Sequence, residues 1–503
     1  MCIILSHCPH FCVYISILTP DLVNTFVTEG YLQYKITSTD GGYNMTDFKD
    51  VPKSPNAIDV ILAYSVSIPS KSIQNYTITI QYRNDEDEDQ SIDSLNNAVV
   101  TGNIFIAEGT IKPALAEAIL RDNLTLEERT DFSIIFNEDT TGIIYQTNQT
   151  EDDSVVYYYS GNTTNNWVKF GKYQNDIVKY WGYYSTTSSW ITEYNTMDEC
   201  TSATSFNINC TEQKYASAGD DMYWRIIRTN EDGSLRLLYS GISPDTTEGY
   251  IGASAFNSSY NDPMYAGYMY GTGGSLESNR TNINDSTIKT YIDNWYENNL
   301  LNNYDKYISK TAIYCDERSV TKDDYFKYVY TGFGYDASTR FVNYKPAYKC
   351  GGDGDGGLFE ATQAVADKFS ASTEGGGNGQ LTYPIALMTA DESVFAGGKY
   401  ETMRQLLSSP YPWYVTNSEG NLISNTAWWY LTPCGWNRTN ALVYNVNDNN
   451  ITDRNDYYYI VNSSVLANNA VRPSLSLSSC VEIKSGNGFP ESPYEIDYES
   501  SCK

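Results

Sequence analysis

The stretch WWYLTPCGWNRTNALVYNVNDNNITDRNDYYYIVNSSVLANNAVRPSLSLSS, from Trp428 to Ser479, decides our interpretation of this chain. It opens with paired tryptophans and closes with an apolar-alternating run that follows Val471, Arg472 and Pro473. Between these ends lie mostly Asn, Asp, Tyr, Arg and Ser. Aromatic and short amide side chains provide contact area and hydrogen bonds at a low cost in conformational entropy. The stretch therefore predicts a rigid frame that carries an exposed recognition face.

We expect this face to span residues 433–465 and to bind a glycan, a protein or a surface partner, because tyrosine rings stack on sugars and Asn and Asp pair with hydroxyl groups. The candidate ligand-binding residues are Trp436, Asn437, Arg438, Tyr444, Asn445, Asn447, Asp448, Asn450, Asp453, Arg454, Asn455, Tyr457, Tyr458 and Tyr459. Asp448, Asp453 and Asp456 could hold one calcium ion, and a solvated Asn-rich loop is the alternative. No other cofactor is expected.

The small number of histidines and the negative net charge exclude or disfavour several classes of function. The chain has two histidines, His7 and His10, so a Ser-His-Asp triad, a Cys-His pair or a His-ligated catalytic zinc is excluded from residue 11 onward. Enzymes that use carboxylates, Lys or Tyr remain open. The net charge of -29, from 33 basic and 62 acidic residues, disfavours binding to nucleic acids and to anionic membrane surfaces.

The ten cysteines form local groups, and none forms a CxxC pair. Isolated pairs and an even count favour disulfides in an oxidising compartment. The pairs that we expect are Cys200–Cys210, Cys315–Cys350 and Cys480–Cys502, and free thiols are the alternative. These cysteines predict an extracellular or cell-surface location, with a signal or anchor missing upstream of Met1. No membrane span is expected in this chain.

The length of 503 residues and the order of apolar patterns predict a β-rich α+β protein with more than one domain. Residues 1–24 are assigned to no domain. Alternating β-branched runs predict a small β-sandwich over 25–110. Ala, Leu and Glu at helical spacing predict a linker helix over 111–130, with a capping box at Thr125 and Glu128 opening a second turn.

From residue 131 onward the sequence indicates a larger β-rich domain that ends near 495, followed by a tail over 496–503. Strands are predicted at 154–161, 165–171, 222–229 and 235–241, with Glu231–Gly233 as the turn between the last two. One clear helix is predicted after Asp285 or Ser286. Asp391 and Glu392 are adjacent, and we interpret them as cap and dipole partners at the start of a short helix.

Several motifs resemble a domain of unknown function that occurs in many secreted or surface proteins of gut Firmicutes. They are MYWRIIRTNEDGSLRLLYSG, IGASAFNSSYNDPMYAGYMYG, TIKTYIDNWYENNL, YCDERS, LTYPIALMTADESVFAGG and the pair AWWYLTP and AVRPSLSLSS. They run in the expected order over roughly residues 130–495. The final pair is also similar to the C-type-lectin-like fold of formylglycine-generating-enzyme relatives.

The resemblance implies that residues 131–495 form a C-type-lectin-like domain. In such a fold Trp428 and Trp429 would pack in the core, and Arg472 would tie the last strand to a loop. The stretch 172–221 departs from the family and would be a disulfide-pinned insertion. The paired cysteines of the true enzymes have no match at Cys434 or Cys480, so that activity is not carried over.

Three functions follow as expectations. The first is a non-catalytic binding or adhesion protein on a bacterial surface or secreted, whose lectin-like face could be a target of a diversity-generating retroelement. The second is a carboxylate-based hydrolase of glycans or peptidoglycan, which would need two carboxylates across a cleft. The third is a structural, fimbria-like surface subunit that assembles through the sandwich.

Overall fold

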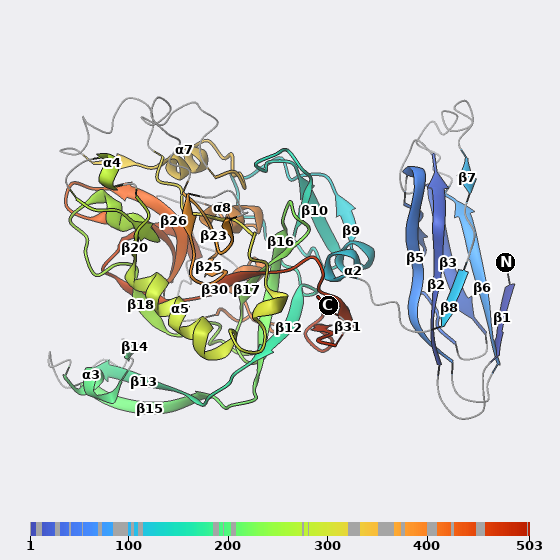
Figure 1. The fold of residues 1–503 in the computed structure, drawn as a ribbon, viewed down its shortest axis with the longest axis horizontal. Helices are drawn as coiled ribbons and strands as arrows, with labels where there is room; N and C mark the ends of the chain where they lie inside the picture. The colour runs from blue at the N-terminus through green and yellow to red at the C-terminus, as the bar shows by residue number, and fades with distance from the viewer. Residues whose placement is uncertain are drawn as a thin grey trace. The chain divides into compact units, whose positions relative to one another are not determined.

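The computed structural model describes most of the chain, and the chain divides into two compact units, Met1–Pro113 and Ala114–Lys503 (Figure 1). The described residues are 2–6, 13–25, 31–39, 42–52, 54–68, 73–83, 99–101, 105–108, 114–184, 191–194, 196–202, 208–273, 276–279, 281–319, 332–350, 367–373, 378–399, 410–423, 427–448, 458–499 and 501–502. Strands dominate both units, which confirms the β-rich α+β class.

The first unit contains two four-stranded sheets. One sheet has the order β1 (Cys2–Ser6), β6 (Ile73–Tyr82), β3 (Leu32–Ser38) and β4 (Lys49–Asp50). In the other, β2 (Val13–Asn24) pairs with β5 (Ser54–Ile68) on one side and with β7 (Val100–Thr101) and β8 (Phe105–Glu108) on the other. Residues 1–24, which the sequence left without a domain, thus contribute two strands.

The two sheets of the first unit share one hydrophobic core. Tyr34 and Ile36 alternate inward along β3, and Tyr76 lies beside them on β6. Leu22 and Leu62 enter the same cluster from β2 and β5. Alternation along strands on both sides of one core is the pattern of a β-sandwich.

A ten-stranded sheet organises the second unit. Its main path is β25 (Ile385–Leu387), β30 (Pro473–Leu477), β17 (Leu235–Tyr239), β16 (Asp221–Thr229), β11 (Val156–Tyr158), β10 (Ile143–Thr147) and β9 (Leu124–Leu126). Off this path, β12 (Trp167–Lys172) pairs with β16 and β32 (Tyr494–Ile496), and β32 pairs with β31 (Ile483–Ser485). The strands expected at 154–161, 165–171, 222–229 and 235–241 are confirmed, although their bounds differ by up to three residues at the ends.

A six-stranded sheet holds the stretch on which our interpretation of the sequence rests. Its path is β18 (Ala253–Ala255), β29 (Asn468–Ala470), β26 (Trp428–Trp436), β27 (Ala441–Asp448) and β28 (Tyr458–Ser464), with β22 (Phe333–Gly334) paired to β26. All nine residues of β26 are buried. As expected, Arg472 donates hydrogen bonds to loop and strand carbonyl oxygens, those of Tyr239, Gly249 and Tyr414.

Short helices and two small sheets complete the described part of the second unit. The α-helices are α2 (Leu115–Asp122), α3 (Met197–Ser202), α4 (Leu276–Asn279), α5 (Thr287–Asn299), α7 (Asp336–Val342) and α8 (Ala390–Phe395). The 3-10 turns are η1 (Pro263–Ala266), η2 (Asp305–Tyr307) and η4 (Trp413–Val415), and the small sheets pair β19 (Met269–Tyr270) with β20 (Asn284–Asp285) and β21 (Tyr314–Cys315) with β23 (Lys368–Ser370) and β24 (Gly379–Gln380). Ser286 caps α5, as predicted. None of the helices in the described ranges is long and apolar enough to cross a membrane.

The expected linker helix over 111–130 is wrong in its extent. Helix α2 ends at Asp122, and Leu124–Leu126 then pair with β10 as a parallel strand, so no second helical turn opens at Thr125. A strand forms here instead of a helical turn because its backbone groups form hydrogen bonds with the edge of the large sheet. Leu115 donates its backbone N–H to Val481 at 2.8 Å, so α2 is packed into the second unit beside that unit's last segment.

The stretch 172–221 forms a three-stranded ribbon of its own. It consists of β13 (Ile177–Tyr184), β14 (Ile191–Tyr194) and β15 (Ile208–Ala216), and Figure 1 shows it leaving the rest of the unit. The Cys200–Cys210 disulfide ties α3 to β15, and the Cys315–Cys350 and Cys480–Cys502 disulfides are also present, so all three expected pairs are confirmed. At the base of the ribbon, Lys179 lies 3.7 Å and 4.2 Å from the ring centres of Tyr215 and Tyr250.

Candidate functional site

The predicted recognition face begins at the turn between β26 and β27. Asn437 is exposed, and its side-chain oxygen accepts hydrogen bonds from the backbone N–H groups of Thr439 (3.2 Å) and Asn440 (2.8 Å). Arg438 is also exposed and has a φ of 85°, a left-handed conformation. The turn is therefore fixed by its own Asx-type hydrogen bonds, because an asparagine side chain satisfies backbone donors two and three residues further on. It projects an amide, a hydroxyl and a guanidinium group from a buried strand.

Three other residues of the predicted face are not exposed. Trp436, Tyr444 and Asn445 are buried, so the expectation of a fully exposed face over 433–465 is wrong at these positions. The Tyr444 hydroxyl lies 2.7 Å from the hydroxyl of Ser338 on α7. Asn445 accepts a hydrogen bond from Ser463 across the β27–β28 pair at 3.2 Å. Their polar groups serve the packing of α7 and β28, which a sequence pattern of Tyr and Asn does not distinguish from ligand contact.

The remaining candidates divide into two groups. Four of them lie in paired strands, with Asn447 opposite Tyr459 and Asp448 opposite Tyr458 in the β27–β28 register. The others lie outside the described residues, namely Asn450, Asp453, Arg454, Asn455, Asp456 and Tyr457. Two of the three proposed calcium ligands belong to this second group, so the calcium site remains a prediction. Within the described ranges, no three His, Cys, Asp or Glu side chains gather as a metal site would require.

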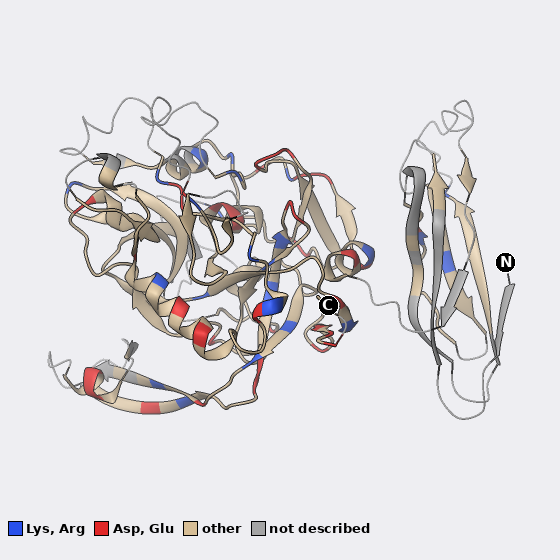
Figure 2. Ribbon diagram, in the orientation of Figure 1, with Lys and Arg blue, Asp and Glu red and all other residues tan. Residues whose placement is uncertain are grey.

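A buried cluster of opposite charges lies elsewhere in this unit, where α7 and α8 meet. Arg340 donates to Asp391 through Nε (3.0 Å) and Nη2 (2.8 Å), and through Nη1 to Glu317 (2.6 Å). Figure 2 shows the basic part of α7 beside the acidic start of α8. Burial lowers the pKa of Arg340, but the charges of Asp391 and Glu317 outweigh it and hold that pKa well above its ordinary value. This guanidinium thus stays charged and links three segments that are distant in sequence.

Glu392, the neighbour of Asp391, forms hydrogen bonds through both its carboxylate and its backbone N–H. Its carboxylate accepts from the backbone N–H of Thr389 (2.9 Å), while the Thr389 hydroxyl accepts from the Glu392 N–H (3.1 Å). This reciprocal pair is a capping box, and it confirms that the adjacent carboxylates open a helix. Arg228 also donates from Nε to the Glu392 carboxylate at 3.2 Å.

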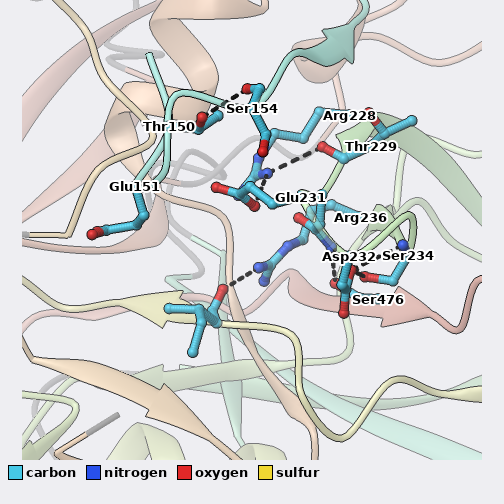
Figure 3. A network of polar contacts seen from close by, with 12 residues as sticks. Thr150, Glu151, Ser154, Arg228, Thr229, Glu231, Asp232, Ser234, Arg236 and Ser476 are labelled. Atoms are coloured by element: carbon cyan, nitrogen blue, oxygen red, sulfur yellow. Dashed lines mark hydrogen bonds and ion pairs between the residues drawn. The ribbon is translucent and has the colours of Figure 1, made fainter. Parts of the chain in front are cut away.

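Arg228 belongs to the network at the end of the β16–β17 hairpin. Figure 3 shows Arg228, Glu231 and Arg236 close together, and Arg228 donates to the carbonyl oxygen of Thr229 at 3.1 Å. In the turn itself, Asp232 accepts from the backbone N–H of Ser234 at 2.9 Å. A cavity of about 20 Å³ lies among these charges and has room for roughly one water molecule. Its charged lining residues are Arg228, Arg236, Arg340, Glu317, Asp391 and Glu392. The charges are paired with one another rather than arranged around an open cleft.

A second set of buried charges follows Cys315. Arg318 donates from Nε to Asp367 at 2.5 Å and from Nη2 to Asn282 at 2.8 Å. Asp316 is fully buried and accepts from the backbone N–H of Tyr268 at 2.6 Å, while its other oxygen has no hydrogen-bond donor among the described residues. Burial, with a contribution from the Asp367 carboxylate, raises the pKa of Asp316 well above its ordinary value. The folded state therefore favours the neutral form of the Asp316 carboxyl group.

Sequence reasoning missed these partners for a physical reason. Residues 316–318 are adjacent, but Glu317 and Arg318 pair with Arg340 and Asp367, which lie 23 and 49 positions away. Nothing local in a single sequence joins such positions. The one available signal was that several charges stand inside otherwise apolar or aromatic segments.

No family model matches this chain, and no curated protein matches it. The resemblance to the Firmicutes surface domain and to the C-type-lectin-like fold therefore remains a prediction.

Proposed function

We propose that this chain is a non-catalytic binding or adhesion protein, secreted or displayed on a bacterial cell surface. Its ligand-binding face would be the end of the β26–β28 sheet, and the ligand a glycan or a protein. The observation that carries this proposal is the exposed turn from Asn437 to Asn440, held by its own hydrogen bonds at the end of a fully buried strand. A preorganised polar turn loses little conformational entropy when it binds.

Two further observations support a binding protein. The three disulfides in the described chain suit an oxidising compartment, where surface and secreted proteins fold. In addition, the buried carboxylates of Glu317, Asp367 and Asp391 each accept hydrogen bonds from an arginine. Carboxylates engaged in this way favour a structural role over the free pair that a glycan hydrolase would use.

The test is a ligand screen on the full chain, with a glycan array and a panel of surface glycoproteins. We expect Arg438→Gln to weaken binding of any ligand found by roughly tenfold, the usual effect of losing a charge-assisted hydrogen bond. Lys484→Gln is the matched control, because it removes an exposed cation from β31 instead. The proposal fails if the screen is empty and the same protein cleaves glycan or peptidoglycan substrates.

A further inference from the structure

A polar pocket in the second unit carries a separate inference. Its volume is about 290 Å³, close to the lower end of small-molecule sites, and large enough for one sugar ring. The walls come from the segment Asn162–Thr164, from Trp167 on β12 and Arg225 on β16, and from the turn Thr416–Gly420. No residue of the Asn437–Asn440 turn lines it, so the pocket is independent of the proposed face.

Arg225 supplies a buried cation in the wall of this pocket. It is 1% exposed, and its hydrogen bonds go from Nε to Asn166 Oδ1 (2.5 Å), from Nη2 to the carbonyl oxygen of Thr163 (2.8 Å) and from Nη1 to that of Thr416 (3.4 Å). All three acceptors are neutral. A guanidinium has five N–H donors, so two of them lack an acceptor in the described part of the chain.

The charge of Arg225 is uncompensated in the same region. No described carboxylate forms an ion pair with it, and Arg472 is the nearby charge that acts on it. Burial first, and then the Arg472 cation, lower the pKa of Arg225 well below its ordinary value. A buried charge is costly unless it is paired, so an anion in the pocket would relieve this cost.

Trp167 provides a second unsatisfied donor at the same place. Its ring is completely buried, and the Arg225 guanidinium carbon lies 4.2 Å from the ring centre. The indole N–H has no acceptor among the residues that the structure describes. Buried donors are almost always paired in folded proteins, so the unpaired N–H of a residue that lines a pocket is a candidate donor to a ligand.

We propose that this pocket binds a small oxyanion carried on a hydroxyl-rich ligand, such as the carboxylate of an acidic sugar. The oxyanion would accept from Trp167 and from the spare N–H groups of Arg225. The hydroxyl groups would meet Thr163, Ser418 and the exposed carboxylate of Glu419, which also line the pocket. Solvent screens the Glu419 charge, so that charge does not prevent an anion from binding deeper inside.

The experiment is calorimetric titration of the full chain with D-glucuronate, D-glucose and acetate. Glucuronate is expected to bind, and glucose, which lacks the carboxylate, to bind at least tenfold more weakly. If acetate binds as tightly as glucuronate, the pocket is a site for free oxyanions. If acetate binds more weakly, the pocket is a site for acidic sugars. Both outcomes support the oxyanion site. Glucose binding as tightly as glucuronate, or the absence of binding by both anions, overturns the proposal.

Two variants locate the binding. Trp167→Phe removes the indole N–H and retains an aromatic ring, and it should weaken glucuronate binding about tenfold. Because Trp167 is completely buried, the smaller ring leaves a cavity and should also lower the melting temperature. Trp428→Phe is the matched control: Trp428 is also buried, its indole N–H also lacks an acceptor among the described residues, and Arg472 lies over its ring, yet it does not line the pocket. Equal effects of the two substitutions on affinity would refute the assignment, whatever the Arg438→Gln experiment shows.

Discussion

Arg340 and Asp391 form two parallel hydrogen bonds, Nε to Oδ1 at 3.0 Å and Nη2 to Oδ2 at 2.8 Å. This forked geometry joins α7 to the start of α8, and the same guanidinium reaches Glu317. Only an arginine presents donors that match a carboxylate in this way. Three segments separated by long stretches of chain thus depend on one side chain.

Replacing Arg340 with glutamine is expected to lower the free energy of unfolding by about 3 kcal/mol, because it leaves two buried carboxylates without their cation. Urea denaturation of the variant and the parent chain measures the difference. Lys214→Gln is the control, since its pair with Asp176 is exposed on both sides and should change nothing measurable. An equal, small effect of both substitutions would show that Arg340 is not the link between the segments.

Asp316 gives the folded protein a dependence on pH. Because its pKa is raised in the folded state, its proton is bound more tightly there than in the unfolded chain. The stabilisation is complete below the ordinary carboxyl pKa and is lost as the pH rises through the raised value. Asp316→Asn keeps a neutral group that can still accept from Tyr268, so stability should fall less than in the parent chain as the pH rises above the ordinary carboxyl pKa.

Urea midpoints at several pH values test this prediction. Asp367→Asn provides the comparison, because it removes the carboxylate that pairs with Arg318 and should lower stability throughout the range. If the Asp316→Asn variant and the parent chain lose stability in parallel as the pH rises, Asp316 is not the group that titrates.

The Cys480–Cys502 disulfide closes a separation of 22 residues. Replacing both cysteines with serine should lower the free energy of unfolding by about 3 kcal/mol, chiefly because the unfolded chain gains freedom. Thermal unfolding measures the loss. A reductant should also destabilise the parent chain, in part by breaking this bridge. The double variant lacks the bridge, so a reductant can lower its stability only through the other disulfides.

A substitution at Tyr444 distinguishes a packing role from a ligand-binding role within the predicted face. Tyr444→Phe removes the hydroxyl that contacts Ser338 and should lower the free energy of unfolding by about 1 kcal/mol. The affinity for a ligand found in the screen should not change, because Tyr444 is fully buried. Loss of affinity without loss of stability would restore Tyr444 as a contact residue.

The sequence predicted the features that depend on neighbours. The Ser286 cap, the Glu231–Gly233 turn region and the Cys200–Cys210 pair all follow from residues close together in the chain. It failed where a distant partner decides the outcome. Leu124–Leu126 became a strand because β10 offered an edge, and Tyr444 turned inward because α7 lies behind it. The pocket beside Arg225 also joins positions from Asn162 to Gly420, which no local pattern connects.

Helix α2 begins beside Val481, and the isolated bridge between Ala114 and Glu482 holds the two segments together. The chain therefore enters the second unit beside the unit's last strands. A unit with adjoining entry and exit points can be cut elsewhere and rejoined, or placed within a loop of another protein, without reorganising its sheets. This arrangement makes the larger unit a candidate for circular permutation and for exchange between proteins as a whole module.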